Sequence, residues 1–223
     1  ELVLYCCCLV FVVDDQTKAD DAYRLACEGT SLLWRGDFHN ARQLLQAMSR
    51  RIERTEQRKA NKKSKSAQNV TDKNVVSNQF HQQRLAQAQR ARILSRVLLE
   101  LAPGYVSDLR RAPDFKTACT EAFGELTEPC LIALRDVQGA LGAAQWREKG
   151  VPIEGIDLSI YPHYAVFAPT RHEYVRLMLD APLPDNQDLA FDIGTGTGLL
   201  AIVLALRGVK QVVATDLNPR ALS

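Results

Sequence analysis

The stretch AFDIGTGTGLLAIVLALRGVKQVVATDLNPRAL, Ala190–Leu222, decides the fold of this chain. It continues a buried strand predicted at Leu189–Ile193, which runs straight into a glycine-rich turn. The apolar run Leu199–Leu206 then predicts a helix, and a second apolar run, Val209–Ala214, predicts another buried strand. A strand, a glycine turn, a helix and a second strand in this order form the layout of a nucleotide-type cofactor site.

The turn and its flanks supply the residues with which we expect a cofactor to be bound. Glycine has no Cβ, so the backbone can turn tightly and approach a ligand closely. The helix behind the turn directs free N–H groups toward that ligand. Asp216, about twenty residues beyond the glycines, is placed to accept two hydroxyl hydrogens of a ribose. The expected cofactor-binding residues here are Asp192, Gly194, Thr195, Gly196, Thr197, Gly198 and Asp216.

The spacing of the glycines separates this motif from that of a dinucleotide site. A dinucleotide fingerprint needs GxGxxG, whereas Leu199 stands at the position of the last glycine and the chain reads DxGxGxG from Asp192. This pattern resembles the first motif of class I S-adenosylmethionine-dependent methyltransferases. The resemblance implies S-adenosyl-L-methionine as cofactor, with Asp192 near its cationic methionine end and Asp216 on its ribose. A purely structural βαβ unit and a nicotinamide or flavin site are the alternatives.

A second part of the resemblance lies directly ahead of the motif, in the segment VFAPTRHEYVRLML, residues 166–179. It looks like the segment before motif one in the HemK-like and "small methyltransferase" groups, where an aromatic-x-Pro element lies over the cofactor. By that resemblance Phe167, Pro169 and Thr170 border the cofactor pocket. The alternative is that they only cap and pack the helix that begins near Thr170.

The sequence assigns no catalytic residue. His163 and His172 could serve as general bases, but no partner acid for either is identifiable from the sequence. The family's fourth motif, which usually holds the nucleophile of the substrate, would lie beyond Ser223. We therefore expect the chain to be truncated after the second core strand and to lack turnover by itself.

The fold class expected is α/β: a Rossmann-like class I methyltransferase core, incomplete in this chain, preceded by a mainly helical N-terminal domain. Residues 1–16 form an apolar extension of unknown role, either a buried strand or unpacked; 17–150 form the helical domain, with a basic loop near 59–78; and 151–223 begin the methyltransferase domain. Helical spacing of apolar residues predicts helices in Lys18–Trp34, after Asp37, in Gln79–Leu101, after Pro113 and from Thr127 to Lys149.

Basic residues gather in one part of the chain, although the net charge of the whole chain is only +2. They fall in two stretches, Arg50–Lys65 and Arg84–Arg96. An Arg-rich face can hold a phosphate backbone, so nucleic acid is one partner that we consider. The alternative is a solvated helix face next to a polar loop, which the lack of interleaved aromatic residues favours.

Composition narrows the remaining classes. None of the six cysteines forms a CxxC pair or has a histidine partner at zinc spacing, so we expect no metal and reduced thiols in a cytoplasmic protein. The apolar run Leu2–Val13 is too short to span a bilayer. The function expected is that of an S-adenosylmethionine-dependent methyltransferase acting on a macromolecule, either a protein side-chain nitrogen or RNA. A non-catalytic cofactor- or nucleic-acid-binding module and a dehydrogenase are the alternatives.

Overall fold

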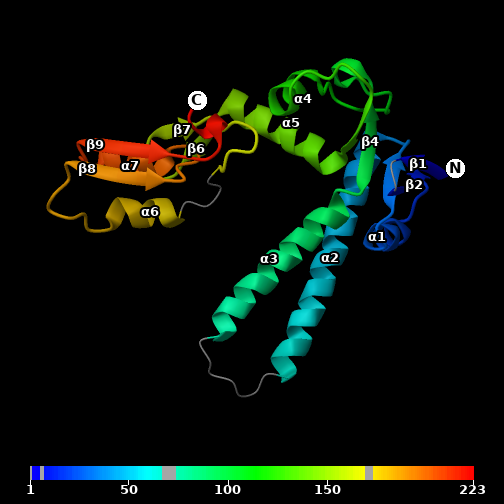
Figure 1. Ribbon diagram of the computed structural model, residues 1–223, viewed down its shortest axis with the longest axis horizontal. Coiled ribbons are helices and arrows are strands. Elements are labelled where there is room, and N and C mark those ends of the chain that lie inside the picture. Colours follow the sequence, from blue (N-terminus) through cyan, green and yellow to red (C-terminus); the bar gives the residue numbers. More distant parts are fainter. Residues whose placement is uncertain (1, 6–7, 67–73, 169–172) are drawn as a thin grey trace. The chain divides into compact units, whose positions relative to one another are not determined.

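The computed structural model describes residues 2–5, 8–66, 74–168 and 173–223 (Figure 1). The chain divides into two compact units. The first comprises Glu1–Lys116 and Glu125–Gln138, and the second comprises Thr117–Gly124 and Gly139–Ser223. The C-terminal unit thus includes most of helix α4 (Lys116–Phe123) and the part of helix α5 (Leu134–Lys149) from Gly139 onward. The functional boundaries expected at residues 16 and 150 stay a prediction.

The N-terminal unit is built on a five-stranded sheet in the order β1-β2-β3-β4-β5. Its central strands β2, β3 and β4 are parallel, and the outer strands β1 and β5 are antiparallel to their neighbours. Parallel neighbours need a crossover connection, which α1 supplies between β2 and β3, and α2 with α3 between β3 and β4. The bounds are β1 Leu2–Tyr5, β2 Cys8–Val13, α1 Ala19–Cys27, β3 Ser31–Trp34, α2 Phe38–Ser66, α3 Asn74–Leu94, β4 Val97–Leu101 and β5 Cys130–Ala133.

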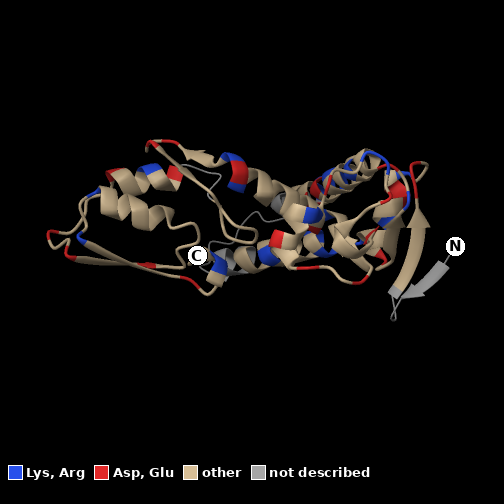
Figure 2. Ribbon diagram, turned by 90° about the horizontal axis from the view of Figure 1, so that it is seen from above, with Lys and Arg blue, Asp and Glu red and all other residues tan. Residues whose placement is uncertain are grey.

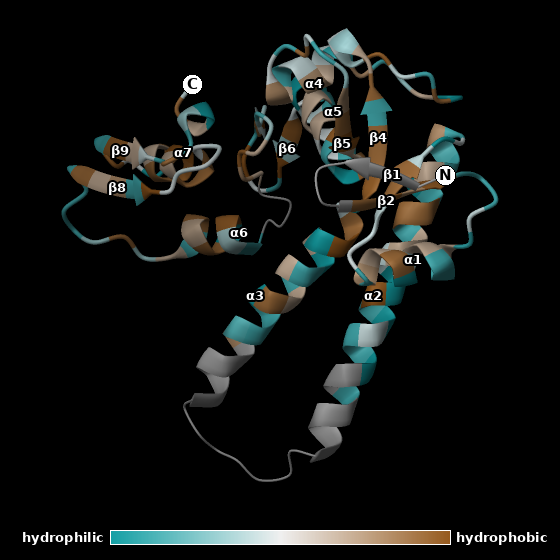
Figure 3. Ribbon diagram, turned by 45° about the vertical axis from the view of Figure 1, so that its right-hand side comes forward, coloured by the Kyte–Doolittle hydropathy of each residue, from teal (hydrophilic) through white to brown (hydrophobic). Residues whose placement is uncertain are grey.

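Strand β3 is covered on both faces of the sheet, whereas β2 and β4 each have one more exposed face; Leu9 and Phe11 of β2 are 51% and 41% exposed. All four residues of β3 are buried, and Val97, Leu99 and Leu101 of β4 are fully buried. Near-continuous apolar runs of this kind are typical of parallel strands covered on both faces. Figure 3 shows that α2 carries hydrophobic residues at its end next to the sheet and mostly hydrophilic ones further along its described length.

Helices occupy most of Ala19–Lys149, but the sequence analysis did not predict the sheet against which they pack. The helix predicted in Lys18–Trp34 ends at Cys27, and the one predicted in Gln79–Leu101 ends at Leu94. The residues that follow each of them pair as strands β3 and β4, and Cys130–Ala133, expected in a helix, is β5. Short apolar runs fit a strand as well as a helix turn, and here pairing with strands distant in sequence decides between them. The N-terminal run is also paired, as β1 and β2.

Other local predictions for this unit are confirmed. The helix expected after Asp37 begins at Phe38, and the Asp37 Oδ1 atom accepts a hydrogen bond from the backbone N–H of His39 at 2.8 Å, as a capping residue does. Its predicted apolar face is buried, namely Phe38, Ala41, Leu44, Leu45, Met48 and Ile52. The bounds of the basic loop predicted near 59–78 are wrong, because α2 continues to Ser66 and α3 begins at Asn74; residues 67–73 lie outside the described part.

Two carboxylates tie together the loops that follow β2 and β3. The Asp15 Oδ1 atom accepts hydrogen bonds from the Asp37 backbone N–H at 2.9 Å and from Asn40 Nδ2 at 3.0 Å. The Asp37 side chain is only 5% exposed, and its Oδ2 atom accepts from Arg111 Nε at 2.7 Å. The guanidinium of Arg111 lowers the pKa of Asp37, and the Asp37 N–H is the main cause that lowers the pKa of Asp15. These charged contacts fix the carboxyl ends of the two strands.

The C-terminal unit holds two small sheets. A hairpin of β6 and β7 is antiparallel, and β8 pairs with β9 in parallel, with α7 connecting them. Its core consists of Ile153, Ile160, Val175, Leu199 and Val203. The bounds are α4 Lys116–Phe123, α5 Leu134–Lys149, β6 Val151–Ile153, β7 Leu158–Ile160, α6 Glu173–Asp180, β8 Leu189–Ile193, α7 Leu199–Leu206 and β9 Gln211–Thr215; short 3-10 turns lie at Pro103–Tyr105 and Pro219–Ala221.

Strand β8 and helix α7 have the bounds predicted, and Gly208 follows α7 with a φ of +94°, as a C-cap glycine does. The second strand begins at Gln211 rather than at Val209. The prediction that the first strand is buried is wrong. Leu189, Phe191 and Ile193 are 49%, 62% and 75% exposed. Side chains two residues apart point to the same face of a strand, so one face of this sheet is apolar and open among the described residues.

Replacing Leu99 with alanine should destabilise the N-terminal unit by about 2–5 kcal/mol, because a fully buried leucine of the central strand β4 would leave a cavity. Urea unfolding followed by the fluorescence of Trp34, in a Trp146→Phe background, measures this change. The matched control is Leu85→Ala, since Leu85 is 63% exposed; its effect should stay within about 0.5 kcal/mol. Equal effects of the two variants would contradict the burial of β4.

Asp37→Asn should make the N-terminal unit less sensitive to acid. Because the folded pKa of Asp37 lies below its unfolded value, the carboxylate stabilises the fold above the unfolded pKa, and this contribution is lost as the pH falls through the folded pKa. The urea midpoint of the wild type should therefore fall more steeply below about pH 4 than that of Asp37→Asn. Asp21→Asn, at an exposed position of α1, is the charge-matched control and should follow the wild type.

Candidate cofactor site

The glycine turn is fastened to the end of the neighbouring strand. Strands β8 and β9 are in register, with Ile193 opposite Thr215 at their carboxyl ends. The carbonyl oxygen of Thr215 accepts hydrogen bonds from the N–H of Gly194 at 2.7 Å and from that of Thr195 at 2.9 Å. The turn therefore starts where both strands end, which is where open parallel sheets bind their ligands.

All three glycines of the turn adopt backbone conformations that other residues rarely take. Their φ angles are +79° at Gly194, +56° at Gly196 and +74° at Gly198, which is also the N-cap of α7. A Cβ added at Gly194 or Gly198 would meet no atom within 4 Å, whereas one at Gly196 would come within 3.4 Å of the carbonyl oxygen of Phe167. The turn thus needs glycine for its shape, and it leaves open space on its outer side.

Asp192 holds the turn against the helix that follows. Its Oδ2 atom accepts a hydrogen bond from the Thr195 hydroxyl at 2.7 Å and one from the backbone N–H of Ala201 at 3.2 Å. The acid ahead of the glycines therefore orients the turn and the first turn of α7. Thr197, also expected to bind the cofactor, is partly exposed beside it.

Asp216 is hydrogen-bonded to the centre of the glycine turn. Its Oδ2 atom accepts from the N–H of Gly196 at 2.8 Å, and its Oδ1 atom accepts from the N–H of Asn218 at 2.8 Å. These amides, that of Asn218 first, lower the pKa of Asp216. Each carboxylate oxygen can accept a further hydrogen bond. An ionised carboxylate with spare acceptor capacity beside the turn fits the two hydroxyls of a ribose.

Asn218 and Arg220, which the sequence analysis did not single out, bind the backbone of residues 164–165. Asn218 Nδ2 donates to the carbonyl oxygen of Ala165 at 3.0 Å. The guanidinium of Arg220 donates to the carbonyl oxygens of Tyr164 at 3.4 Å and Ala122 at 2.8 Å, and it lies 5.9 Å from the centre of the Tyr164 ring. The Asn-Pro pair at 218–219 is a turn signal that could have indicated a special geometry here.

Among the predicted border residues, the structure places Phe167 beside the turn. Its backbone lies next to Gly196 and its side chain is 71% exposed. Pro169, Thr170 and His172 lie outside the described residues. Residues 164–167 therefore border the glycine turn: Phe167 lies next to Gly196, and Asn218 and Arg220 bind the backbone of residues 164–165.

His163 has the partner acid that the sequence could not identify. Its Nδ1 atom lies 3.5 Å from Glu121 Oε1, and its Nε2 atom is in contact with the guanidinium of Arg147. Arginine only donates, so Nε2 accepts and the ring proton of the neutral form sits on Nδ1, facing Glu121. Because Nε2 is already used, this ring is not positioned to take a proton from a substrate as it stands.

Comparisons with known proteins match the same part of the chain. The family model of ribosomal protein L11 methyltransferase (PrmA) matches residues 168–223. The ribosomal protein L11 methyltransferase of Geobacter sulfurreducens is 33% identical over 122 residues, 45% of this chain and 40% of that protein. A putative protein N5-glutamine methyltransferase of Methanocaldococcus jannaschii is 36% identical over 72 residues, 32% of this chain and 34% of that protein.

The resemblance to class I methyltransferases of the small group is confirmed. The ribosomal protein L11 methyltransferase of Aquifex aeolicus agrees with it, at 34% identity over 89 residues, 35% of this chain and 36% of that protein. The relatives favour a methyltransferase over a dehydrogenase. The matches cover at most 40% of the length of these relatives. We call residues 168–223 the methyltransferase segment.

The residues of the methyltransferase segment fit an adenosyl cofactor. Open space lies over Gly194 and Gly198, an exposed aromatic side chain borders Gly196, and the Asp216 carboxylate has acceptor capacity left. No group of three His, Cys, Asp or Glu residues that could hold a metal ion occurs in the part of the chain that the structure describes. Among the same residues, no helix is long and apolar enough to span a membrane.

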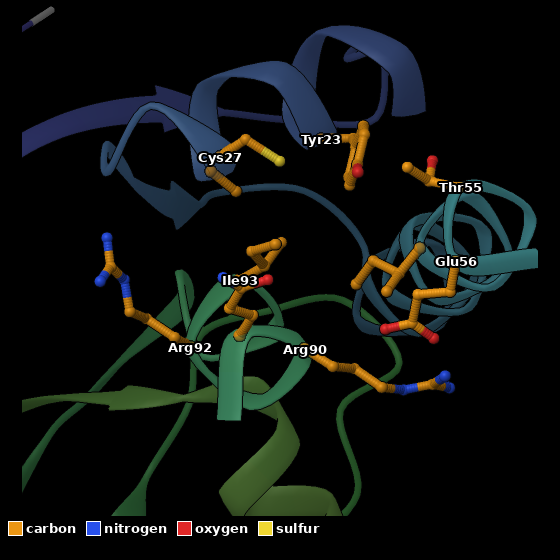
Figure 4. A pocket seen from close by; sticks show the side chains of 10 residues that line it. Tyr23, Cys27, Thr55, Glu56, Arg90, Arg92 and Ile93 are labelled. Atoms are coloured by element: carbon orange, nitrogen blue, oxygen red, sulfur yellow. The ribbon is translucent and has the colours of Figure 1, made fainter. Parts of the chain in front are cut away.

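A hollow of about 300 Å³ lies apart from this site, among α1, α2 and α3 of the N-terminal unit (Figure 4). Figure 4 shows Tyr23, Cys27 and Ile93 turned toward it, whereas Arg90 and Arg92 extend away from it. Burial raises the pKa of Tyr23, and a hydrogen bond with Cys27 adds to the shift. The residues that line this hollow come from three separate helices, so no local sequence motif indicates it.

Gly196→Ala should destabilise the C-terminal unit, because alanine at a φ of +56° is strained and its Cβ would press on the carbonyl oxygen of Phe167. Gly142→Ala is the matched control, since Gly142 lies inside α5 and an added Cβ there meets nothing within 4 Å. That change should stabilise the helix by about 0.5–1 kcal/mol. Thermal unfolding followed by circular dichroism measures both. A Gly196→Ala protein as stable as Gly142→Ala would contradict the turn geometry.

Proposed function

We propose that this protein is an S-adenosylmethionine-dependent methyltransferase that acts on a macromolecule, with a protein side-chain nitrogen as the favoured acceptor and RNA as the second. The observation that carries the proposal is the hydrogen bond between Asp216 and the N–H of Gly196, at the carboxyl ends of two parallel strands. Relatives named as protein methyltransferases favour the protein acceptor.

The proposed cofactor contacts follow from the geometry of the site. Asp216 would accept the ribose hydroxyls through its remaining lone pairs, and the glycine turn would let the cofactor approach the backbone closely. Phe167 would cover the adenosyl group from the side of Gly196. The proposed contact residues are those expected from the sequence, Asp192, Gly194, Thr195, Gly196, Thr197, Gly198, Asp216, Phe167, Pro169 and Thr170; the last two lie outside the described residues and are proposed from the family resemblance alone.

S-adenosylmethionine supplies a methyl group that its sulfonium already activates. What remains for the chain is to bind the cofactor and to align an acceptor opposite the leaving sulfur, so proximity and orientation supply much of the rate. The positive charge is lost during transfer, so a site that binds the cation too strongly would slow the reaction. Asp192 meets this requirement, because Thr195 and Ala201 already donate to its Oδ2 atom. We assign it an orienting role and no proton transfer.

The catalytic residue is left unassigned, since His163 is engaged with Arg147 and Glu121. A cytoplasmic location is proposed from the relatives, two of which are named as enzymes of a ribosomal protein. The second candidate is a module that binds the cofactor without catalysis. Binding of S-adenosylhomocysteine is compatible with this candidate, whereas methyl transfer would exclude it.

Isothermal titration with S-adenosylhomocysteine tests the cofactor assignment. The wild-type chain should bind, and Asp216→Ala should lose at least about tenfold in affinity, because hydrogen bonds to a charged group contribute about 1.5–3 kcal/mol. Asp188→Ala is the control, since that carboxylate is exposed just ahead of β8 and pairs with Lys210 at 2.6 Å; its affinity should match the wild type. Tight binding of NADH without binding of S-adenosylhomocysteine would overturn the proposal.

The acceptor is tested with the full-length protein, by transfer of a labelled methyl group from S-adenosylmethionine to cell extract separated into protein and RNA. We expect label in the protein fraction, in acid-stable form as for a nitrogen-bound methyl group. Label in RNA alone would move the proposal to its second acceptor. Binding of S-adenosylhomocysteine with no transfer to either fraction would support the non-catalytic module.

A further inference from the structure

The positive charge of the chain is concentrated in α2 and α3, which we call the basic hairpin (Phe38–Ser66 and Asn74–Leu94). Helix α2 contains nine Lys and Arg against two Glu, and α3 contains three Arg and no acid. The hairpin helices thus carry a formal charge of +10, whereas the whole chain carries +2 and the remaining residues together carry −8. In Figure 2 the acidic residues are correspondingly spread over the other elements. Such a partition of charge is a recognised sign of a polyanion-binding surface.

The base of the basic hairpin is braced, which leaves the outer part to interact with a partner. Arg51 pairs with Asp20 of α1, and Arg90 of α3 donates to Ser49 Oγ and Glu53 Oε1 of α2. Figure 1 shows the two helices leaving the sheet of the N-terminal unit alongside each other. These contacts engage Arg51 and Arg90 but not Arg50, Arg54 or Arg58.

Three arginines form an exposed row on α2. Arg50, Arg54 and Arg58 are all exposed, and their spacing of four residues puts them on one face at intervals of about 6 Å. This face points away from the buried side of α2, which carries Met48 and Ile52. No hydrogen bond or salt bridge joins the three guanidinium groups to another residue that the structure describes. Guanidinium groups in a regular row fit successive phosphates of a nucleic acid.

Helix α3 supplies an exposed aromatic side chain, that of Phe80. Phe80 is 57% exposed, the guanidinium of Arg84 lies 5.7 Å from the centre of its ring, and the ring of His81 lies 6.3 Å away. Because Arg90 contacts Ser49 and Glu53, the antiparallel helices bring Arg84 roughly level with Arg58, by the rise of about 1.5 Å per residue. An exposed ring stacked with arginine is a platform for an unpaired base.

We propose that the basic hairpin binds single-stranded RNA, with the row of Arg50, Arg54 and Arg58 on its phosphates and Phe80 with Arg84 against an unpaired base. Charge alone would also suit an acidic protein or an anionic membrane, but the guanidinium of Arg84 beside the exposed ring of Phe80 favours an unpaired base. Unstacked bases next to accessible phosphates are the form in which RNA loops are recognised. The proposal is independent of the cofactor site, because all of its residues belong to the N-terminal unit.

Fluorescence anisotropy with the whole chain and a labelled single-stranded RNA of about 20 nucleotides tests the proposal. The variant R50A/R54A/R58A should bind at least tenfold more weakly. Its slope of log affinity against log salt should be shallower by about two, since each phosphate contact contributes about 0.7. The control is R24A/R176A/K210A, which removes the same charge at exposed positions outside the hairpin and should bind like the wild type.

A second variant separates stacking from charge. Phe80→Ala should weaken binding of single-stranded RNA several-fold and leave binding of an RNA duplex unchanged, because a duplex offers no free base. Equal losses in the two triple variants would overturn the proposal, and so would tighter binding of duplex DNA, polyglutamate or anionic vesicles than of RNA. Circular dichroism and S-adenosylhomocysteine binding should stay at wild-type values in every hairpin variant, so a failure here is distinguishable from a failure of the methyltransferase assignment.

Discussion

The hydrogen bond from the N–H of Gly196 to the carboxylate of Asp216 is the contact on which the C-terminal unit depends. It closes a loop of twenty residues through the turn, α7 and β9. Asp192 fixes the same turn from the other side, through Thr195 and Ala201. Two acids therefore shape one turn by accepting hydrogen bonds from its backbone and its threonine. A turn held in this way needs little further ordering when a ligand binds, and preorganisation of this kind favours binding.

The residues beyond β9 extend the same principle to a distant segment. Asn218 and Arg220 hold the carbonyl oxygens of Ala165 and Tyr164, and this places Phe167 next to Gly196. Side chains that bond to backbone carbonyls fix a segment regardless of which side chains it carries. The site is thus built from three parts of the sequence, and only the glycine turn with its flanking acids has a recognisable motif.

The N-terminal unit shows a different use of charge. Its carboxylates Asp15 and Asp37 are bonded to arginines and backbone amides at the ends of β2 and β3, where they fix the fold. The arginines Arg50, Arg54 and Arg58 have no such partner among the described residues. Arginines that are bonded to a carboxylate, such as Arg110 and Arg111, thus stabilise the fold. Arginines without such a bond are available to bind a partner. A residue count cannot make this distinction, because it depends on which charges the fold brings together.

The sequence by itself determined the methyltransferase segment closely: β8, the glycine turn and α7 lie where predicted. Its signals are local, since glycines with positive φ and a helix-length apolar run act through neighbouring residues. Only the tertiary structure decided that Ser31–Trp34 and Val97–Leu101 are strands. Strands β3 and β4 pair residues 65 positions apart in sequence, such as Leu33 and Leu98. A short apolar run becomes a strand only when such a partner is brought beside it. Tertiary structure also decided that His163 lies beside Glu121 and that the side chain of Phe80 is exposed. Both depend on packing that no local sequence pattern encodes.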